Sequence, residues 1–359
     1  MDVFGTRELW SRLKNIGKPI LLYGMGNGAD KIIKVLDRLG ISVDGVFASD
    51  GFARGNLFHG MKVMSYAEAS EKFGDFTVLI SFGSALPDVL ANMKKIAAEK
   101  ETYAPDVPVA GDEIFNAEFY LKNEKSIAAA REILADDASR EAYDEIIKYK
   151  LDGDISHFRI DSEKDAALKN LLSGGYSAYI DLGAYNGDTV KKALSYFPTI
   201  GKITALEPSP RIFKKLEKTA FPDTCFIQLY NCAAWDGNGS AGFVDGAGRN
   251  SQLSGESEIQ AHDSHKEDVT LAAVDGLCDY KGEKMLIKLD VEGSESRALD
   301  GMRRIISEND CELIVSAYHR SEDIFSLPLK IKKMLPRHKI YLRKHPYVPA
   351  WDINLYVTK

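Results

Sequence analysis

Two carboxylates and two glycines in the C-terminal half of the sequence have the spacing of a nucleotide-cofactor site. Asp181 lies in the apolar segment 178–182, and Gly183 and Gly187 follow in a loop that opens an amphipathic helix. Glycine lets the backbone approach a ligand without a Cβ atom in the way. Glu207 ends the next apolar segment, about 20 residues beyond the glycine loop, where a doubly wound sheet binds ribose hydroxyls. We therefore expect an adenosine-type ligand, although the glycines also suit an ordinary strand-to-helix turn.

The residue at the start of that helix distinguishes between adenosine cofactors. A dinucleotide site places a pyrophosphate at the helix N-terminus, usually within a G-x-G-x-x-G/A loop. This loop places Asp188 there instead, and a carboxylate repels a phosphate. The sulfonium and amino groups of S-adenosylmethionine are cationic and tolerate a nearby carboxylate. The loop therefore favours S-adenosylmethionine.

Three segments of the chain resemble the FkbM-type S-adenosylmethionine-dependent methyltransferases. That family has an Asp-x-Gly-Ala loop, a strand ending in Glu-Pro and a later Lys-x-Asp-x-Glu-Gly segment. The chain contains Asp181-Leu-Gly-Ala184, Glu207-Pro208 and Lys288-Leu-Asp-Val-Glu-Gly293, of which the third is the most family-specific. Where the family often has Ala-Asn after the first glycine, this chain has Ala184-Tyr185-Asn186. The resemblance covers roughly the C-terminal half and implies methyl transfer from S-adenosylmethionine.

The resemblance also suggests which residues contact the cofactor. It places the adenine edge next to Asn231, which follows the third strand. Asp290 is able to bind the methionine amino group, to orient a base or to bind the substrate. The expected cofactor-binding residues are Asp181, Gly183, Tyr185, Asn186, Gly187, Asp188, Glu207, Asn231 and Asp290.

Three residues at the ends of later strands are candidates for catalysis: Asp290, Glu292 and His319. Methylation of an alcohol requires the oxygen to lie in line with the sulfonium methyl carbon and to lose its proton, so one general base is needed. We expect His319 to be that base. His319 also suits a structural histidine at a strand end, and Glu292 also suits a carboxylate that favours a helix N-terminus.

The same three side chains make a divalent metal ion conceivable, because they offer hard oxygen and imidazole ligands to Mg²⁺ or Mn²⁺. The resemblance is not to the metal-dependent catechol methyltransferases, so we expect no metal. It does imply a small-molecule or glycan acceptor, with O-methylation of a hydroxyl on a carbohydrate or a secondary metabolite.

The N-terminal segment 1–115 has the alternation of a small Rossmann-like domain. The apolar segment 19–23 leads into Gly24-Met-Gly-Asn-Gly-Ala29, a G-x-G-x-x-A match, and Asp50 lies near the distance of a ribose acid. A lone glycine motif is weak evidence. A nucleotide site and a scaffold without a ligand both remain open for this segment.

The expected fold class is α/β, with two Rossmann-like doubly wound units. Segment 116–165 predicts a helical linker or lid, with helices at 125–134 and 138–151. Segment 166–359 predicts a class I methyltransferase fold, and a segment rich in glycine and serine, 236–266, predicts mobile loops over the active site. Strands are expected at 178–182, 203–207, 225–229, 285–290 and 312–317, with a closing antiparallel hairpin at 340–343 and 354–357.

Composition excludes several classes of protein. The 359 residues carry a net charge of −7, which argues against a dedicated nucleic-acid binder. The four cysteines form no C-x-x-C pair, which favours reduced thiols over disulfides or a zinc site. No apolar run has the length of a signal region or a membrane span, so we expect a cytoplasmic protein. The sequence does not indicate an oligomeric state.

Two other functions remain open at this point. One is a nucleotide- or NAD-linked sugar-modifying enzyme that uses the N-terminal glycine loop. The other is a non-catalytic protein that uses both Rossmann-like units to bind a nucleotide-linked ligand.

Overall fold

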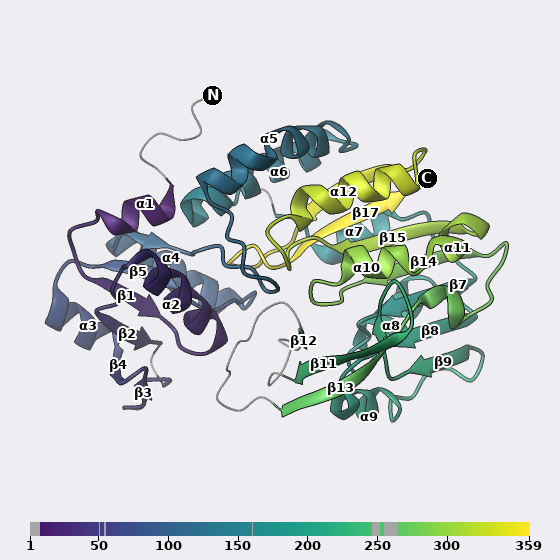
Figure 1. Ribbon diagram of the computed structural model, residues 1–359, viewed down its shortest axis with the longest axis horizontal. Coiled ribbons are helices and arrows are strands. Elements are labelled where there is room, and N and C mark those ends of the chain that lie inside the picture. Colours follow the sequence, from purple (N-terminus) through teal and green to yellow (C-terminus); the bar gives the residue numbers. More distant parts are fainter. Residues whose placement is uncertain (1–7, 50, 54, 160, 246–251, 255–264) are drawn as a thin grey trace.

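The computed structural model describes residues 8–49, 51–53, 55–159, 161–245, 252–254 and 265–359. Two large β-sheets lie side by side, one formed within residues 20–103 and the other within residues 178–358 (Figure 1). Parallel strand pairs dominate both sheets. The expected α/β fold with two Rossmann-like units is therefore confirmed.

The N-terminal unit is a six-stranded sheet with helices on both faces. Its elements are α1 (Leu9–Lys14), β1 (Ile20–Tyr23), α2 (Asn27–Leu39), β2 (Gly45–Ala48), β3 (Leu57–Phe58), β4 (Met61–Ser65), α3 (Tyr66–Phe73), β5 (Thr77–Ile80), α4 (Pro87–Glu99) and β6 (Thr102–Tyr103). The strand order is β3-β4-β2-β1-β5-β6, and β3 alone pairs antiparallel among these strands. Leu22 packs in a cluster with α1 and α2, whereas its neighbour Tyr23 packs in a cluster with α3 and α4. Strands buried on both faces are typical of such parallel sheets.

The C-terminal unit is a seven-stranded sheet with the order β16-β17-β15-β14-β7-β8-β9. Its strands are β7 (Ala178–Leu182), β8 (Lys202–Leu206), β9 (Phe226–Tyr230), β14 (Lys284–Leu289), β15 (Asp310–Ser316), β16 (Lys339–Lys344) and β17 (Ile353–Thr358). β17 runs antiparallel to both β15 and β16. The closing hairpin predicted from the sequence is thereby confirmed.

Helices cover both faces of this second sheet. They are α7 (Lys164–Leu171), α8 (Asp188–Tyr196), α9 (Pro210–Leu216), α10 (Glu295–Asp300), α11 (Arg303–Glu308) and α12 (Asp323–Met334). Ile203 and Leu286 pack with residues of α7, α8 and α9, whereas Ile287 and Leu289 pack with residues of α10, α11 and α12. The C-terminal unit is thus doubly wound, as expected.

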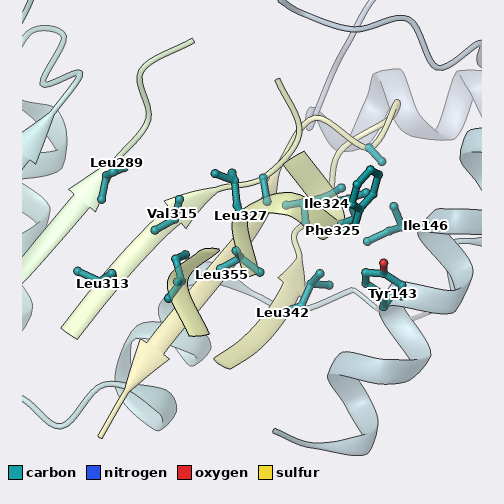
Figure 2. Packing of buried hydrophobic residues seen from close by; sticks show 14 of the residues in the cluster. Tyr143, Ile146, Leu289, Leu313, Val315, Ile324, Phe325, Leu327, Leu342 and Leu355 are labelled. Atoms are coloured by element: carbon teal, nitrogen blue, oxygen red, sulfur yellow. The ribbon is translucent and has the colours of Figure 1, made fainter. Parts of the chain in front are cut away.

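Two helices that precede the C-terminal sheet in sequence extend one of its covering layers. α5 (Ala117–Glu132) contacts α12, and α6 (Asp137–Asp152) contacts β16. Figure 2 shows Ile146 of α6 beside the side chains of α12 and the C-terminal strands, in the same buried cluster as Phe325 and Leu342. Burial of one such aliphatic side chain contributes about 1.5–3 kcal/mol. The expected linker is therefore part of the packing of the C-terminal unit.

Three local predictions from the sequence differ from the structure. α5 begins eight positions before the expected start at 125, because the Asn116 side chain accepts a hydrogen bond from the Phe119 amide at 2.8 Å and caps the helix there. The apolar residues Ala298, Leu299, Met302, Ile305 and Ile306 have the spacing of one face of a single helix after Glu295, but the structure divides this segment into α10 and α11. A Cβ atom on Gly301 would lie 1.9 Å from the Trp235 carbonyl oxygen, so the chain turns where this glycine meets another backbone.

The third difference concerns the segment expected to form mobile loops. It contributes β11 (Gly239–Asp245), β12 (Gln252–Ser254) and β13 (His265–Ala272), which form a four-stranded sheet with β10 (Ala233–Ala234). Residues 246–251 and 255–264 lie outside the described part of the chain. Where the chain is described, no helix is both long enough and apolar enough to cross a membrane.

Candidate active site

A cavity of about 1010 Å³ lies between the two units, beyond the carboxyl ends of β7, β8 and β14. Ligands in open α/β sheets bind at these strand ends. Ligand pockets are commonly about 300–1,000 Å³, so this cavity is large enough for a cofactor and a second molecule. The C-terminal unit contributes Gly183, Tyr185, Asp188, Glu207, Asp290 and Glu292, and the N-terminal unit contributes Asn27, Gly28, Lys31, Phe82 and Ala110.

The glycine loop after β7 is held against β14 by a contact that requires glycine. Gly183 has φ +82°, and a Cβ atom on it would lie 1.9 Å from the carbonyl oxygen of Asp290. The Gly183 and Ala184 amides donate to the Leu206 carbonyl at 3.0 and 2.9 Å. The loop therefore sits where the ends of three strands meet, with its backbone facing the cavity.

Asp181 is fully buried and is occupied by protein groups. Its carboxylate accepts hydrogen bonds from Tyr179 Oη at 3.1 Å, Thr189 Oγ1 at 2.5 Å and Lys288 Nζ at 3.0 Å. Lys288 also donates to the Gly183 carbonyl at 3.0 Å. Asp181 does not line the cavity. In this structure these three donors occupy the Asp181 carboxylate, which thereby fixes the loop.

Glu207 follows β8, as expected of a ribose-binding acid, and lines the cavity. The Tyr185 amide donates to Oε2 at 3.0 Å, and the Ser209 amide donates to Oε1 at 2.9 Å. Burial raises the pKa of Glu207 to about 7, and the hydrogen bonds from the two amides only partly offset this effect. The carboxyl group is therefore fixed in direction and titrates near neutral pH.

The remaining expected cofactor residues divide into two groups. Tyr185 and Asp188 line the cavity, whereas Asn186, Gly187 and Asn231 do not. The Asn231 amide nitrogen donates to the Glu207 carbonyl at 2.8 Å and to the Pro208 carbonyl at 3.0 Å. Asn231 thus fixes the end of β8, and the segment that follows it, residues 232–235, lines the cavity instead.

The three residues expected for catalysis do come together. The His319 side chain is fully buried, and its Nε2 atom lies 3.5 Å from Asp290 Oδ1 and 3.6 Å from Glu292 Oε2. A third carboxylate, that of Glu295, places Oε1 2.8 Å from His319 Nδ1. Glu295 is itself fully buried and also accepts a hydrogen bond from the Val291 amide at 2.9 Å. One imidazole therefore lies among three carboxylates.

The charges around His319 disfavour a role as general base. Burial alone would lower the pKa of His319, but Glu295, Glu292 and Asp290 outweigh it and raise the pKa to about 10. The ring is then an imidazolium near neutral pH and has no free lone pair to accept a proton. Burial raises the pKa of Glu292 to about 8, whereas the cations Lys288 and His319 outweigh burial at Asp290 and lower its pKa.

The N-terminal unit forms the opposite wall of the cavity and is joined to the His319 segment. The Ala110 amide donates to the His319 carbonyl at 2.8 Å, and Ser321 Oγ donates to the Glu113 carbonyl at 2.6 Å. Lys31 of α2 lines the cavity and donates to the carbonyls of Pro108 and Val109. Burial lowers the pKa of Lys31 to about 8. The N-terminal glycine loop therefore opens into the same cavity as the C-terminal loop.

The sequence from Asp181 to Pro346 matches the family model described as the methyltransferase FkbM domain, residues 181–346. This segment contains the glycine loop, Glu207 and the carboxylate cluster around His319. Residues 181–346 are therefore similar to an FkbM-type methyltransferase domain. The resemblance inferred from the three motifs is thereby confirmed.

A comparison of structures extends the similarity of fold to the N-terminal unit. The crystal structure of methyltransferase FkbM from Methylobacillus flagellatus is 18% identical, with a TM-score of 0.70, and the match covers 99% of this chain and 92% of that one. Precorrin-6y C5,15-methyltransferase from Geobacter metallireducens is 12% identical over 55% of this chain and 91% of its own, with a TM-score of 0.30. The fold comparison therefore rests on the first structure. The search of curated proteins found no match.

Sequence reasoning missed three features of the methyltransferase site. Lys288 belongs to the quoted motif, but its pairing with Asp181 depends on the neighbouring register of β7 and β14. Glu295 lies three positions after Glu292, at the start of a helix. This spacing is the feature of the sequence that could have predicted a second carboxylate beside Glu292. The sequence did not predict that the N-terminal unit lines this cavity, because that depends on how the two units pack against each other.

Proposed function

We propose that the protein transfers a methyl group from S-adenosylmethionine to a hydroxyl of a carbohydrate or a related secondary metabolite. The observation that carries this proposal is the position of Glu207, which lines the cavity at the end of β8 and whose carboxylate is oriented by two backbone amides. A carboxylate at this position suits the two ribose hydroxyls of an adenosine cofactor. The family match supports the transfer of a methyl group.

The cofactor would lie over the glycine loop of the methyltransferase domain. Gly183 and Tyr185 would face its methionine part, Glu207 its ribose, and residues 232–235 its adenine. Asp188 lines the same region and carries a negative charge that suits a sulfonium. This arrangement leaves the part of the cavity next to Asp290 and the N-terminal wall for the acceptor.

The proposed reaction is a single displacement at the methyl carbon. The acceptor oxygen forms a bond to the methyl carbon, the carbon–sulfur bond breaks, and its electron pair stays on sulfur as the cofactor becomes S-adenosylhomocysteine. The hydroxyl proton passes to a base. His319 is an unsuitable base in its cationic form, and the raised pKa of Glu292 leaves that group mostly protonated near neutral pH. Asp290 lines the cavity, has a lowered pKa and is the ionised carboxylate placed to accept the proton.

The acceptor would bind between the two units. The N-terminal wall includes Phe82, and the loop between β16 and β17 adds Tyr347 and Trp351. Gly83 lies so close to this loop that a Cβ atom on it would come within 2.6 Å of the Tyr347 ring. Aromatic side chains beside carboxylates suit a ligand with apolar faces and hydroxyl groups, which a sugar ring has.

Calorimetric titration with S-adenosylmethionine tests the cofactor part of the proposal. We expect one site per chain, with affinity at least about tenfold weaker in Glu207→Ala because charged hydrogen bonds contribute about 1.5–3 kcal/mol each. Glu217→Ala is the matched control, since Glu217 is exposed on the next helix end, and it should bind like the unaltered protein. Absence of binding to the folded, unaltered protein would refute the proposal.

A parallel titration with NADH addresses the alternative in which the N-terminal glycine loop runs a nucleotide-linked reaction. Asn27 and Gly28 of that loop line the same cavity as Glu207. NADH binding that persists in Glu207→Ala, without binding of S-adenosylmethionine, would support that alternative. Binding of S-adenosylmethionine without methylation of any acceptor in a panel of sugars and alcohols would instead favour a non-catalytic binding protein.

A further inference from the structure

The carboxylate cluster around His319 has buried polar atoms without hydrogen bonds. The Nε2 atom of His319 and the Oε2 atom of Glu295 make no hydrogen bond within the described structure, and the close contact of His319 Nδ1 with Glu295 Oε1 lacks hydrogen-bond geometry, although both side chains are fully buried. Buried polar atoms in native proteins nearly always have a hydrogen-bonding partner, so an exception calls for an explanation such as an ion. The other buried carboxyl group nearby, Asp323, accepts a hydrogen bond from the Arg320 amide at 2.8 Å and needs no such explanation.

The distances within the cluster fit ligands of one cation. Two atoms bound about 2.1–2.2 Å from the same ion at tetrahedral or octahedral angles lie roughly 3.0–3.5 Å apart. His319 Nε2 lies 3.5 Å from Asp290 Oδ1 and 3.6 Å from Glu292 Oε2. The ligand atoms that all lie within 4.8 Å of one another are those of Asp290, Glu295 and His319, and Glu292 is not among them. Asp290 and His319 are therefore close enough to share an ion, and the Glu292 side chain, next to His319, would move toward Asp290 to complete the site.

The two ring nitrogens of His319 have different surroundings. Nδ1 lies 2.8 Å from Glu295 Oε1, which is the distance of direct contact, whereas Nε2 faces the two carboxylates that line the cavity. Histidines that bind metals commonly present the other nitrogen to a carboxylate, which orients the ring. Glu295 would thus orient His319 and leave Nε2 for an ion.

The charge of the cluster also favours a cation. Three carboxylates surround a single imidazole, and the nearby Lys288 ammonium is bound to Asp181 and the Gly183 carbonyl. We propose that Asp290, Glu292 and His319 form a divalent-cation site at the edge of the cavity, with Glu295 orienting the histidine. Imidazole and carboxylate ligands together suit an ion such as Mn²⁺, with remaining positions taken by water or by an acceptor oxygen.

The cation would act on the acceptor, and this part of the inference rests on the proposed function. An ion at this place would bind the acceptor hydroxyl, stabilise its oxyanion and hold it for attack on the methyl carbon. It would also explain how a hydroxyl group is activated without His319 as a base.

Titration of the 359-residue chain with Mn²⁺ tests the site, with binding followed by calorimetry and by the paramagnetic resonance signal of free Mn²⁺. We expect one ion per chain. Asp290→Asn and Glu292→Gln should each weaken binding at least about tenfold. Both substitutions nearly preserve side-chain shape, and both residues are about one third exposed, so the fold should survive; thermal unfolding checks this. Glu322→Gln, a carboxylate outside the cluster, is the control and should bind Mn²⁺ like the unaltered protein.

Two results would overturn the inference: a folded protein that does not bind Mn²⁺ stoichiometrically, or binding that both variants retain at full strength. Titration with S-adenosylmethionine separates this failure from failure of the proposed function. Binding of S-adenosylmethionine without binding of Mn²⁺ would refute the cation site and leave the proposed methyl transfer standing. Mn²⁺ binding that depends on Asp290 and Glu292, in a protein that does not bind the cofactor, would support the ion site and remove the methyl-transfer proposal.

Discussion

The backbone amide of Ala110 donates a hydrogen bond of 2.8 Å to the carbonyl oxygen of His319. Ala110 follows the N-terminal sheet, whereas His319 follows β15 of the C-terminal sheet. Gly293 makes this approach feasible, since a Cβ atom on it would lie 2.4 Å from the Cβ atom of Ala110. The N-terminal unit therefore reaches the methyltransferase site through backbone contacts at its carboxylate cluster.

Removal of this amide should loosen the joint between the units. Ala110→Pro lacks the N–H group, and we expect faster hydrogen–deuterium exchange in residues 104–115 and 291–295. The affinity for S-adenosylmethionine should stay within about twofold, because the proposed cofactor contacts come from the other wall. Ala110→Gly retains the amide and serves as the control. Equal loosening in the glycine variant would show that the hydrogen bond is not the cause.

The affinity for S-adenosylmethionine should depend on pH through Glu207. Burial raises the pKa of this carboxyl group to about 7, so it is largely protonated at pH 6 and ionised at pH 8. Only the ionised form accepts hydrogen bonds from both ribose hydroxyls. We expect Kd, measured by calorimetry, to rise as pH falls below about 7, approaching tenfold per pH unit. A Kd in Glu207→Gln with the same pH dependence would assign the effect to another group.

A methyl group at Gly183 should disrupt the site and the fold together. It would lie 1.9 Å from a backbone oxygen, at a residue with φ +82°. We expect Gly183→Ala to lower the free energy of unfolding by about 3 kcal/mol or more, measured by urea denaturation. Gly201→Ala is the control, since a Cβ atom there meets nothing within 4 Å. Equal stability of the two variants would contradict the close approach of β7 and β14.

The packing of α6 on the C-terminal unit can be measured at Ile146, which is fully buried among the residues shown in Figure 2. Ile146→Ala should lower the free energy of unfolding by about 2–5 kcal/mol. Leu121→Ala on α5 should change it by about 0.5 kcal/mol or less, because Leu121 is 57% exposed. A small effect at Ile146 in urea denaturation would mean that α6 is only a loosely attached connector.

The sequence predicted those features that depend on local patterns. An apolar strand followed by glycines located the loop at Gly183, and the spacing to Glu207 located the second carboxylate on the neighbouring strand. Both are properties of one βα unit and need no knowledge of distant contacts. The closing hairpin was equally local, since two apolar strands flank a short connection.

Features that depend on contacts between segments far apart in the sequence could not be predicted from local patterns. The position of Asp181 at a strand end predicted a ligand-binding acid. In the structure its carboxylate accepts a hydrogen bond from Lys288, which lies 107 residues later in the chain. His319 suited a base by residue type, but the raised pKa follows from three carboxylates that the fold brings around it. The chain turns between α10 and α11 at Gly301 because the backbone of Trp235 lies against it. The periodicity of apolar residues in one segment carries no information about such a distant contact.

The attachment of α6 to β16 also affects the order in which the chain can fold during synthesis. The Leu342 amide donates to Ser139 Oγ at 3.0 Å, and Arg343 donates to Asp136 at 2.6 Å, across separations of 203 and 207 residues. A ribosome that has released α6 must therefore add about 200 further residues before that helix meets its strand. During this interval the apolar side of α6 is uncovered, and the nascent chain becomes a substrate for chaperones.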